Sequence, residues 1–244
     1  MKVSVVMTCY NTSKFVAEAI KSVVFQSYKD WVLVIVDDAS TDNTVQVVNE
    51  TLAKFKVRDK AKIILHKQNY GCGQSLSDAI NASSGELIAV LDSDDVLASG
   101  VLALVVQPHV DKSISLVYTN YMRCDSKLQP VKLVKNFQMP EGKSYIDFMK
   151  GVSHLKCFKR SSYDKTEGIN RSLLKSVDKD LVVKLEEVGK LYYVNTVGYF
   201  YREHGNSISN SFFRKPKDKQ SEMIKGRKAI VENARIRRSI GRPQ

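Results

Sequence analysis

The sequence predicts an α/β protein with a Rossmann-like, mostly parallel central sheet flanked by helices. Short apolar runs of the kind that form strands buried on both faces alternate with helical segments from Lys2 to Thr119. This alternation favours parallel strands joined by right-handed crossovers. Three of the runs stop abruptly at polar residues, and open α/β sheets bind their ligands beyond the carboxyl ends of strands. With 244 residues, 43% of them hydrophobic, the chain is long enough for a substantial core.

The elements of this first half are closely spaced. Strands are expected at residues 2–8, 31–36, 61–65, 87–91 and 115–119, and helices at 13–26, around 45–55, at 75–83 and at 98–106. Ser40 or Thr41 is expected to cap the second helix, because a hydroxyl there can accept a free backbone N–H. The polar strand ends at Tyr10, at Asp38 and at the acidic run after Leu91 share one edge of the predicted sheet.

The second half is less regular. A polar loop or hairpin is expected at residues 125–141, a short helix at 144–149, a strand at 153–159, a helix at 176–188 and two strand-like runs within 191–201. The last thirty residues predict a polar helix or helix pair, in which Ile230, Ala234 and Ile240 are the best candidates for an inward face.

The charge of the chain is concentrated near its end. Of the formal net charge of +12, eleven Lys or Arg against three acidic residues between Arg214 and Arg242 contribute +8, which leaves +4 for the rest. This asymmetry favours a tail that contacts an anionic surface and argues against a nucleic-acid-binding body.

Other features bear on location and redox state. The sequence has no long uncharged apolar stretch and does not begin with the pattern of a signal peptide, so a cytoplasmic protein is expected. Its four cysteines, at positions 9, 72, 124 and 157, show no paired spacing, and ordinary buried thiols are expected.

An acidic run follows the apolar residues 87–91. It consists of Asp92, Ser93, Asp94 and Asp95. Like charges this close repel, so the run requires water, basic partners or a hard cation with oxygen ligands. A solvated turn in which Asp95 or Ser99 caps the next helix is the simpler interpretation. We favour a metal site that carries an anionic substrate.

Taken in order, these motifs resemble those of the family 2 glycosyltransferases of the GT-A fold. The resemblance covers residues 2–209 and includes Thr-Cys-Tyr-Asn, Asp-Asp-Ala-Ser-Thr-Asp, Asn-Tyr-Gly, Asp-Ser-Asp-Asp and Tyr-Arg-Glu-His-Gly-Asn-Ser. It implies a GT-A domain at 1–210, with a nucleotide-binding half (1–119) and an irregular acceptor half (120–210), before a basic helical tail at 211–244. It also implies sugar transfer from a nucleotide diphosphate to a hydroxyl, usually with inversion and with Mn²⁺ or Mg²⁺.

The resemblance also implies site residues. Asp38 would accept a hydrogen bond from the imide of uracil while Tyr10 stacks on the ring, although a helix cap and a core aromatic are the simpler roles. Asp92 belongs to the ribose region. The residues implied on the donor side are Thr8, Tyr10, Asp38, Asn69, Asp92, Ser93, Arg202 and Ser207, and those implied for the metal are Asp94, Asp95 and His204.

Asp178 is the candidate general base. Direct displacement at the anomeric carbon needs one carboxylate that takes the proton of the acceptor hydroxyl. Many relatives have a Glu-Asp pair at this point, whereas this chain has Val177 before Asp178, so Asp180 remains a rival. Both carboxylates would also suit a helix N-terminus without any catalytic role.

Arg202 and His204 lie in the late motif that closes over the diphosphate in the family. A guanidinium offers a fork for phosphate oxygens, and a neutral imidazole offers a contact to metal or phosphate. Structural hydrogen bonding is the alternative for His204.

The sequence thus predicts a metal-dependent, inverting glycosyltransferase with a UDP-sugar as donor and a glycan or lipid-linked acceptor, in surface polysaccharide synthesis. The basic tail would hold the enzyme at the inner face of a membrane, join it to another protein, or form a solvated helix. One rival is a sugar nucleotidyltransferase, although residues 8–13 lack the glycines of its phosphate loop. The other is a basic nucleic-acid-binding protein, although no stripe of basic and aromatic residues supports it. The sequence leaves the oligomeric state open.

Overall fold

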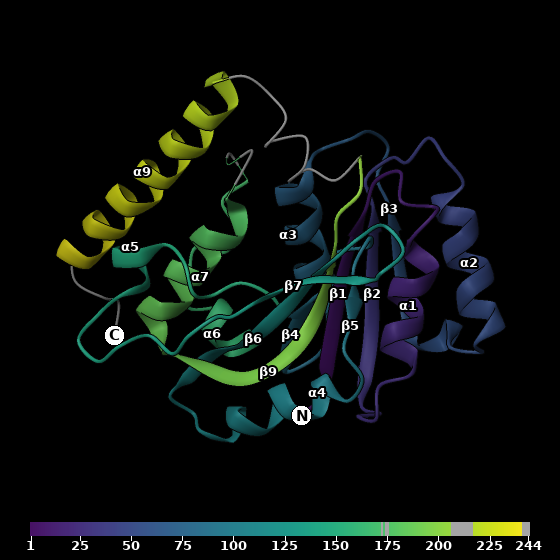
Figure 1. Cartoon of the computed structure of the whole chain (residues 1–244), viewed down its shortest axis with the longest axis horizontal. Helices are drawn as coiled ribbons and strands as arrows, with labels where there is room; N and C mark the ends of the chain where they lie inside the picture. Colours follow the sequence, from purple (N-terminus) through teal and green to yellow (C-terminus); the bar gives the residue numbers. More distant parts are fainter. Residues whose placement is uncertain (172, 174–175, 206–216, 241–244) are drawn as a thin grey trace.

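The computed structural model describes residues 1–171, 173, 176–205 and 217–240, and these form a single sheet covered by helices on both faces (Figure 1). The strand order is β3-β2-β1-β4-β8-β6-β9-β5, with β7 paired to β6. The strands are β1 (Val3–Cys9), β2 (Trp31–Asp37), β3 (Ala61–Leu65), β4 (Leu87–Val90), β5 (Val96–Leu97), β6 (Ile114–Cys124), β7 (Pro130–Val134), β8 (Lys156–Lys159) and β9 (Lys190–Arg202).

The helices form two layers. The α-helices are α1 (Val16–Val24), α2 (Thr44–Lys54), α3 (Cys72–Ala82), α4 (Val101–Val106), α5 (Tyr145–Phe148), α6 (Arg160–Tyr163), α7 (Val177–Val188) and α9 (Lys217–Ser239), and the 3-10 helices are η1 (Arg58–Lys60) and η2 (Gln107–Val110). Apolar side chains of α1, α2 and α4 pack on one face of the sheet. Those of α3, α6 and α7 pack on the other, with α9 outermost (Figure 1).

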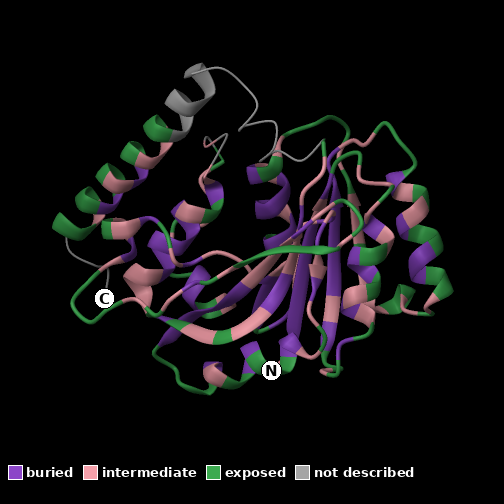
Figure 2. Ribbon diagram, viewed as in Figure 1, coloured by how far each residue is buried: buried purple, intermediate pink, exposed green. Residues whose placement is uncertain are grey.

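The composition of β1 shows why the strands are apolar throughout. Val3, Val5 and Met7 belong to the core on one face, whereas Val6 belongs to the core on the other. Because successive strand residues point to opposite faces, a strand with helices on both sides requires an unbroken apolar run. Figure 2 shows the resulting buried band through the centre of the sheet.

The expected first half is confirmed. Strands β1, β2, β3 and β4 are parallel and pair in the order 3-2-1-4, close to the predicted bounds. The expected strand at 115–119 is also present as part of β6, but it does not lie beside β4. Strand β8 is inserted between them, antiparallel to both. The sheet is therefore mixed at this point, although β6 and β9 are again parallel.

Three strands differ from expectation, one in the first half of the chain and two in the second. The short strand β5 was not predicted, and β7 forms one arm of the hairpin expected at 125–141. The two runs expected within 191–201 are one strand, β9. Its register with β6 shifts between Val194 and Val197, and this irregularity explains why the sequence pattern is interrupted there.

The predicted cap of α2 is wrong. The N-cap is Asn43, and its side chain does not cap the helix. Instead, the Ser40 hydroxyl donates to Asp37 at 2.6 Å, and Asp42 Oδ1 accepts from the Thr44 backbone N–H at 2.9 Å. The polar side chains after β2 therefore bind one another within their loop.

The basic tail contains one long helix, α9, that packs on α7. Ile230 and Ala234 are buried in the same apolar cluster as α7, as expected, whereas Ile240 is 79% exposed and does not belong to the inward face. Arg237 and Arg238 of α9 form ion pairs with Glu187 and Glu186, respectively. None of the described helices combines the length and apolar character needed to cross a membrane.

Candidate active site

The loops that follow β1 and β2 are bound to each other at the carboxyl edge of the sheet. The Asn11 side-chain oxygen accepts from the backbone N–H groups of Thr41, at 2.8 Å, and Asp42, at 3.3 Å. The Asn11 backbone N–H donates to Ser40 Oγ at 2.9 Å. Asn11 and Ala39 both have positive φ, at 53° and 61°. Such backbone conformations are uncommon outside glycine and concentrate at functional sites.

Asp38 organises the neighbouring turn. Its carboxylate accepts from the backbone N–H groups of Tyr70, at 2.9 Å, and Gly71, at 2.8 Å, and its Oδ1 lies 2.8 Å from His66 Nδ1. Burial alone would raise the pKa of Asp38, but the hydrogen bonds from His66, Tyr70 and Gly71 outweigh it and hold that pKa below its usual value. Gly71 has φ +88°, which favours glycine. The predicted contact with uracil would be a further hydrogen bond to the Asp38 carboxylate.

A polar cavity of about 430 Å³ lies between these loops and the end of β9. Its lining residues are Asn11, Ser13, Lys14, Phe15, Thr41, Asp42, His204 and Gly205. Tyr10, which precedes Asn11, is 50% exposed, so its ring is accessible to a ligand. Thr8 hydrogen-bonds the Cys72 thiol, and Asn69 is exposed in the turn held by Asp38.

Asp92 and Asp94 lie beyond the end of β4. The Asp92 backbone N–H donates to the Tyr199 hydroxyl at 3.0 Å, which ties the acidic run to β9. Burial, followed by the negative charge of Asp94, raises the pKa of the Asp92 carboxyl to about 6. Asp94 Oδ2 lies 2.9 Å from His204 Nε2. The site therefore holds an excess of negative charge with one imidazole against it.

Two predicted site residues of the acidic run, Asp95 and Ser93, have buried side chains. Asp95 is 1% exposed, and its Oδ1 accepts from the Arg202 backbone N–H at 2.7 Å. Burial and the charges of Asp94 and Asp92 hold its pKa well above the usual value. Ser93 is buried with its hydroxyl on the Cys9 sulfur. The other carboxylate oxygen of Asp95, Oδ2, is buried and has no hydrogen-bond partner among the described residues. The metal contact of Asp95 and the nucleotide contact of Ser93 therefore stay predictions.

Arg202 is likewise bound to groups of the protein. Its guanidinium is 3% exposed and binds the backbone oxygens of Asp94, at 2.8 Å, and Ser126, at 3.0 Å, as well as the Glu18 carboxylate. It also lies over the Phe15 ring, 4.8 Å from its centroid. With all three nitrogens occupied, Arg202 fixes the acidic run to α1 and has no free fork for a diphosphate. Ser207 lies outside the described residues.

Asp94 and His204 are the candidates to hold a divalent cation. The Asp94 carboxylate is the kind of oxygen ligand that Mg²⁺ and Mn²⁺ prefer. The 2.9 Å between Asp94 Oδ2 and His204 Nε2 is the length of a direct hydrogen bond between the two side chains, so the imidazole holds the carboxylate in place. In the described part of the chain, no group of three or more His, Cys, Asp or Glu residues could hold a metal. Mg²⁺ sites commonly use one or two protein carboxylates, and substrate phosphates supply further ligands.

The two candidate bases lie in contrasting environments at the start of α7. The Asp178 side chain is 51% exposed, and its charge acts on Asp92 across the site. The Asp180 side chain is 2% exposed, and its Oδ2 lies 2.8 Å from the Nζ of the equally buried Lys184. Of the two carboxylates, Asp178 is therefore the one that solvent reaches.

Two residues of the site were missed by the sequence reasoning. Lys156 of β8 is 6% exposed, and its Nζ lies 3.8 Å from Asp178 Oδ2. Cys72, expected to be an ordinary buried thiol, is an exposed residue at the start of α3. Desolvation of its sulfur, followed by the charges of Asp92 and Asp178, raises the pKa of the Cys72 thiol to about 12. Neither residue belongs to a motif, so only the fold shows their position.

Comparison with solved structures defines the class of fold. The structure superposes on TarS of S. aureus in complex with UDP-GlcNAc with a TM-score of 0.72 and 19% identity, over 91% of this chain and 64% of that one. It superposes on the mannosyltransferase PcManGT of Pyrobaculum calidifontis, in complex with GDP-Man and Mn²⁺, with a TM-score of 0.65 and 18% identity, over 87% of this chain and 59% of that one. The fold is that of the GT-A glycosyltransferases.

The chain belongs to glycosyl transferase family 2, whose model matches residues 4–176. It is 29% identical over 209 residues to the chondroitin synthase of Escherichia coli, with 85% of this chain and 30% of that protein aligned. It is also 29% identical over 152 residues to a UDP-Glc:alpha-D-GlcNAc-diphosphoundecaprenol beta-1,3-glucosyltransferase, WfgD of Escherichia coli, over 61% of this chain and 55% of that one. The chain thus spans less than a third of the length of the first relative.

Proposed function

We propose that this protein is a metal-dependent, inverting glycosyltransferase that transfers a sugar from a UDP-sugar to a hydroxyl of a glycan or lipid-linked acceptor. The observation that carries the proposal is the pair formed by Asp94 and His204, 2.9 Å apart, where His204 also lines the cavity between the loops after β1 and β2. Family membership sets aside the nucleotidyltransferase and nucleic-acid-binding alternatives. The division into a domain at 1–210 and a tail at 211–244 is part of the proposal.

Asp94 and His204 would hold Mn²⁺ or Mg²⁺. When bound, the ion supplies positive charge to the leaving diphosphate. The chain's own residues do the rest of the work on this side: Arg202 keeps the acidic run in place, and Asp38 keeps the turn at 69–71 beside the nucleotide.

Asp178 would accept the proton of the acceptor hydroxyl. The hydroxyl oxygen then forms a bond to the anomeric carbon as the bond from that carbon to the diphosphate oxygen breaks. Attack from the side opposite the leaving group inverts the anomeric configuration, and no covalent bond to the protein is needed. The exposure of Asp178 and its electrostatic contact with Asp92 support this role.

UDP is proposed as the nucleotide by analogy with TarS and WfgD, whereas PcManGT is bound to GDP-Man. TarS binds UDP-GlcNAc, and WfgD is named for UDP-Glc and for a diphosphoundecaprenol acceptor. By analogy, surface polysaccharide synthesis in the cytoplasm is the proposed setting. The exposed face of α9 carries Lys225, Lys228 and Arg235, which suits a peripheral contact with an anionic membrane.

A thermal shift titration tests the donor and metal assignments. UDP, GDP, CDP and dTDP are each added with Mn²⁺ or with a chelator, to the wild type and to Asp94→Ala. A ligand at about 100 times its dissociation constant stabilises the folded state by about 2.7 kcal/mol. We expect UDP with Mn²⁺ to raise the midpoint of the wild type only, after which UDP-sugars are screened for hydrolysis. A wild type that responds to none of the nucleotides would contradict the proposal.

A further inference from the structure

The surroundings of Asp178 are cationic, in contrast to the acidic donor side. Lys156 lies 3.8 Å from the Asp178 carboxylate and is buried, with one further hydrogen bond from its Nζ to the Ser153 carbonyl at 3.2 Å. It lies between Asp178 and Asp92, since its charge acts on both. Lys156 thus balances the carboxylates that are already present.

Two further cations, Lys179 and Arg227, are present in addition to the Lys156 charge that offsets these carboxylates. Lys179 follows Asp178 on α7, and its Nζ donates to the Met149 carbonyl at 2.8 Å rather than to a carboxylate. Burial lowers the pKa of Lys179, as do the positive charges of Arg227 and Lys156, whereas the charge of Asp178 raises it. Arg227 lies on the face of α9 that carries the buried Ile230 and Ala234, and these two residues belong to the same apolar cluster as Val177 of α7. The charge of Arg227 also acts on the buried Tyr145 of α5, as does that of Asp178.

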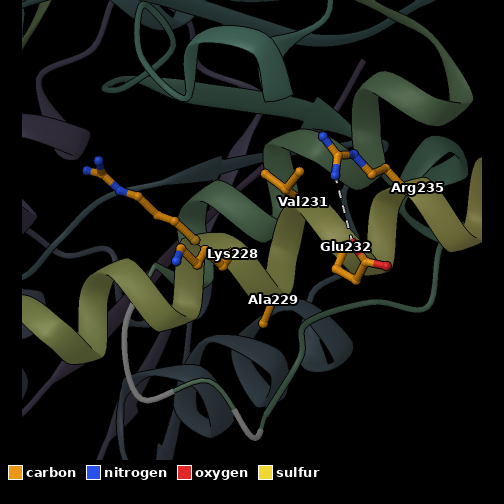
Figure 3. Close-up of a pocket in the computed structure, with 6 residues that line it drawn as sticks. Lys228, Ala229, Val231, Glu232 and Arg235 are labelled. Carbon is orange, nitrogen blue, oxygen red and sulfur yellow. Dashed lines mark ion pairs between the residues drawn. The ribbon is translucent and has the colours of Figure 1, made fainter.

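Arg227 is only partly satisfied within the described structure. Its Nε is buried and has no hydrogen-bond partner among the described residues. Arg227 lines a pocket on α9 together with Lys228, Ala229, Val231, Glu232 and Arg235 (Figure 3). Glu232 is the carboxylate of that pocket, and it is ion-paired with Arg235 at 3.9 Å. A buried guanidinium nitrogen without an acceptor costs free energy, and a bound anion would remove that cost.

We propose that Lys179 and Arg227, supported by Lys156, form an oxyanion subsite beside Asp178, and that the acceptor carries a carboxylate or phosphate group near the hydroxyl that is glycosylated. The inference extends the proposed function, because it assigns a chemical class to the acceptor of the same site. Its components come from β8, α7 and α9, and Arg227 lies beyond the residues that match the family model.

The subsite can be tested without knowledge of the acceptor. The donor site of the full-length protein is first saturated with UDP and Mg²⁺, so that added anions cannot occupy it. Inorganic phosphate, D-glucuronate and uncharged D-glucose are then titrated in turn, and the thermal midpoint is followed. We expect one or both anions to raise the midpoint and glucose to leave it unchanged. A larger response to glucuronate assigns a uronic acid, and a larger response to phosphate assigns a phosphorylated acceptor.

Variants identify the residues responsible. We expect Arg227→Gln and Lys179→Gln each to weaken anion binding about tenfold or more, because each removes a charged hydrogen-bond donor. Arg227→Lys retains the charge and is expected to restore most of the binding. Lys228→Gln is the matched control, because Lys228 is the exposed neighbour of Arg227 on the same helix. All four variants are expected to bind UDP as the wild type does.

The outcomes separate this inference from the proposed function. An equal response to anions in Arg227→Gln, Lys179→Gln and Lys228→Gln would overturn the subsite, as would a wild type that responds to neither anion. If UDP fails to bind while the anion response depends on Arg227, the subsite stands and the donor assignment fails. If UDP binds and the anions do not, the donor assignment stands and the subsite fails.

Discussion

The donor side and the acceptor side of the site differ in how their charges are satisfied. On the donor side, the carboxylates of Asp92 and Asp94 lie close together, and a metal ion is proposed to supply the missing positive charge. On the acceptor side, Lys156 is ion-paired with Asp178, and Lys179 and Arg227 are the further cations of the proposed subsite. The difference indicates that the protein requires an added cation for the diphosphate of the donor but brings its own cations to the acceptor.

The role of the acceptor side is tested most directly by substitution of Asp178. We expect Asp178→Asn to lower kcat about 10²-fold to 10⁴-fold, because an amide cannot take the proton of the acceptor hydroxyl. The affinity for UDP should change little, since Asp178 faces Asp92 but is not assigned to the nucleotide. Steady-state kinetics with a UDP-sugar and UDP binding by thermal shift measure the two effects separately.

Asp180→Asn is the matched control for Asp178→Asn. Asp180 is buried against Lys184, so its loss should cost about 3 kcal/mol of unfolding free energy by removing the nearer of the two carboxylates on that buried ammonium. The kcat of the protein that remains folded should be close to that of the wild type. The reverse pattern, with catalysis lost in Asp180→Asn and retained in Asp178→Asn, would exchange the two roles.

The sequence predicted the convergence of the donor-side motifs, whereas on the acceptor side it indicated Asp178 but not the cations, and the reason is physical. The motifs at Tyr10, Asp38 and Asp92 each follow an apolar strand in the parallel part of the sheet, so their convergence on one edge follows from topology. Lys156 lies in a strand whose antiparallel insertion no local pattern indicates. Arg227 is one of eleven cations in a tail of weak periodicity.

Even on the donor side, residue type alone did not predict which groups a side chain contacts. Arg202 and Asp95 belong to motifs that suggest phosphate and metal contacts, but both are buried and bound to neighbouring groups. Orientation depends on how β9 runs beside the acidic loop, which is a tertiary property. His204, two residues beyond Arg202, does face Asp94.

The pH dependence of stability tests the support of the acceptor side, because His109 packs against β8, the strand that carries Lys156. His109 is 2% exposed, its Nε2 lies 3.1 Å from the Cys157 carbonyl and so donates to it, and burial lowers its pKa to about 4. An unfolded histidine titrates near 6.5. The unfolded state therefore binds the proton first, and the folded state loses about 3 kcal/mol as the pH falls from 6.5 to 4.

His109→Gln should reduce that pH dependence. Glutamine keeps a donor for the Cys157 carbonyl but does not titrate, so the variant should lose less unfolding free energy than the wild type between pH 7 and pH 4. Urea unfolding at several pH values measures the difference. Parallel curves for the two proteins would mean that His109 is protonated as readily in the folded state as in the unfolded state.

Asp95→Asn tests whether the donor side uses one carboxylate of the acidic run or two. Because Asp95 is buried on the Arg202 backbone, we expect the variant to retain the UDP and Mn²⁺ response to within about twofold, which is under about 0.5 kcal/mol. Asp94→Asn should abolish that response. Thermal shift titrations of the two variants in parallel supply the measurement, and equal losses in both would restore Asp95 as a metal ligand.

The smallest expected effect concerns the attachment of α9, which carries Arg227 to the acceptor side. Arg237 Nε lies 2.7 Å from Glu187 Oε2 of α7, and both side chains are mostly buried. Arg237→Gln should therefore cost about 1 kcal/mol, between the values for exposed and buried pairs. Hydrogen exchange should rise in α9 before it rises in the sheet, because the substitution removes one of the ion pairs that hold the helix on α7 and leaves that of Arg238. Arg235→Gln, whose partner Glu232 lies on the same exposed face, is the control and should leave exchange unchanged. If α9 loosens in Arg237→Gln and the anion response of the acceptor side weakens with it, the helix and the subsite are one unit; an anion response that survives the loosening would place the cations of that subsite on α7 and β8 alone.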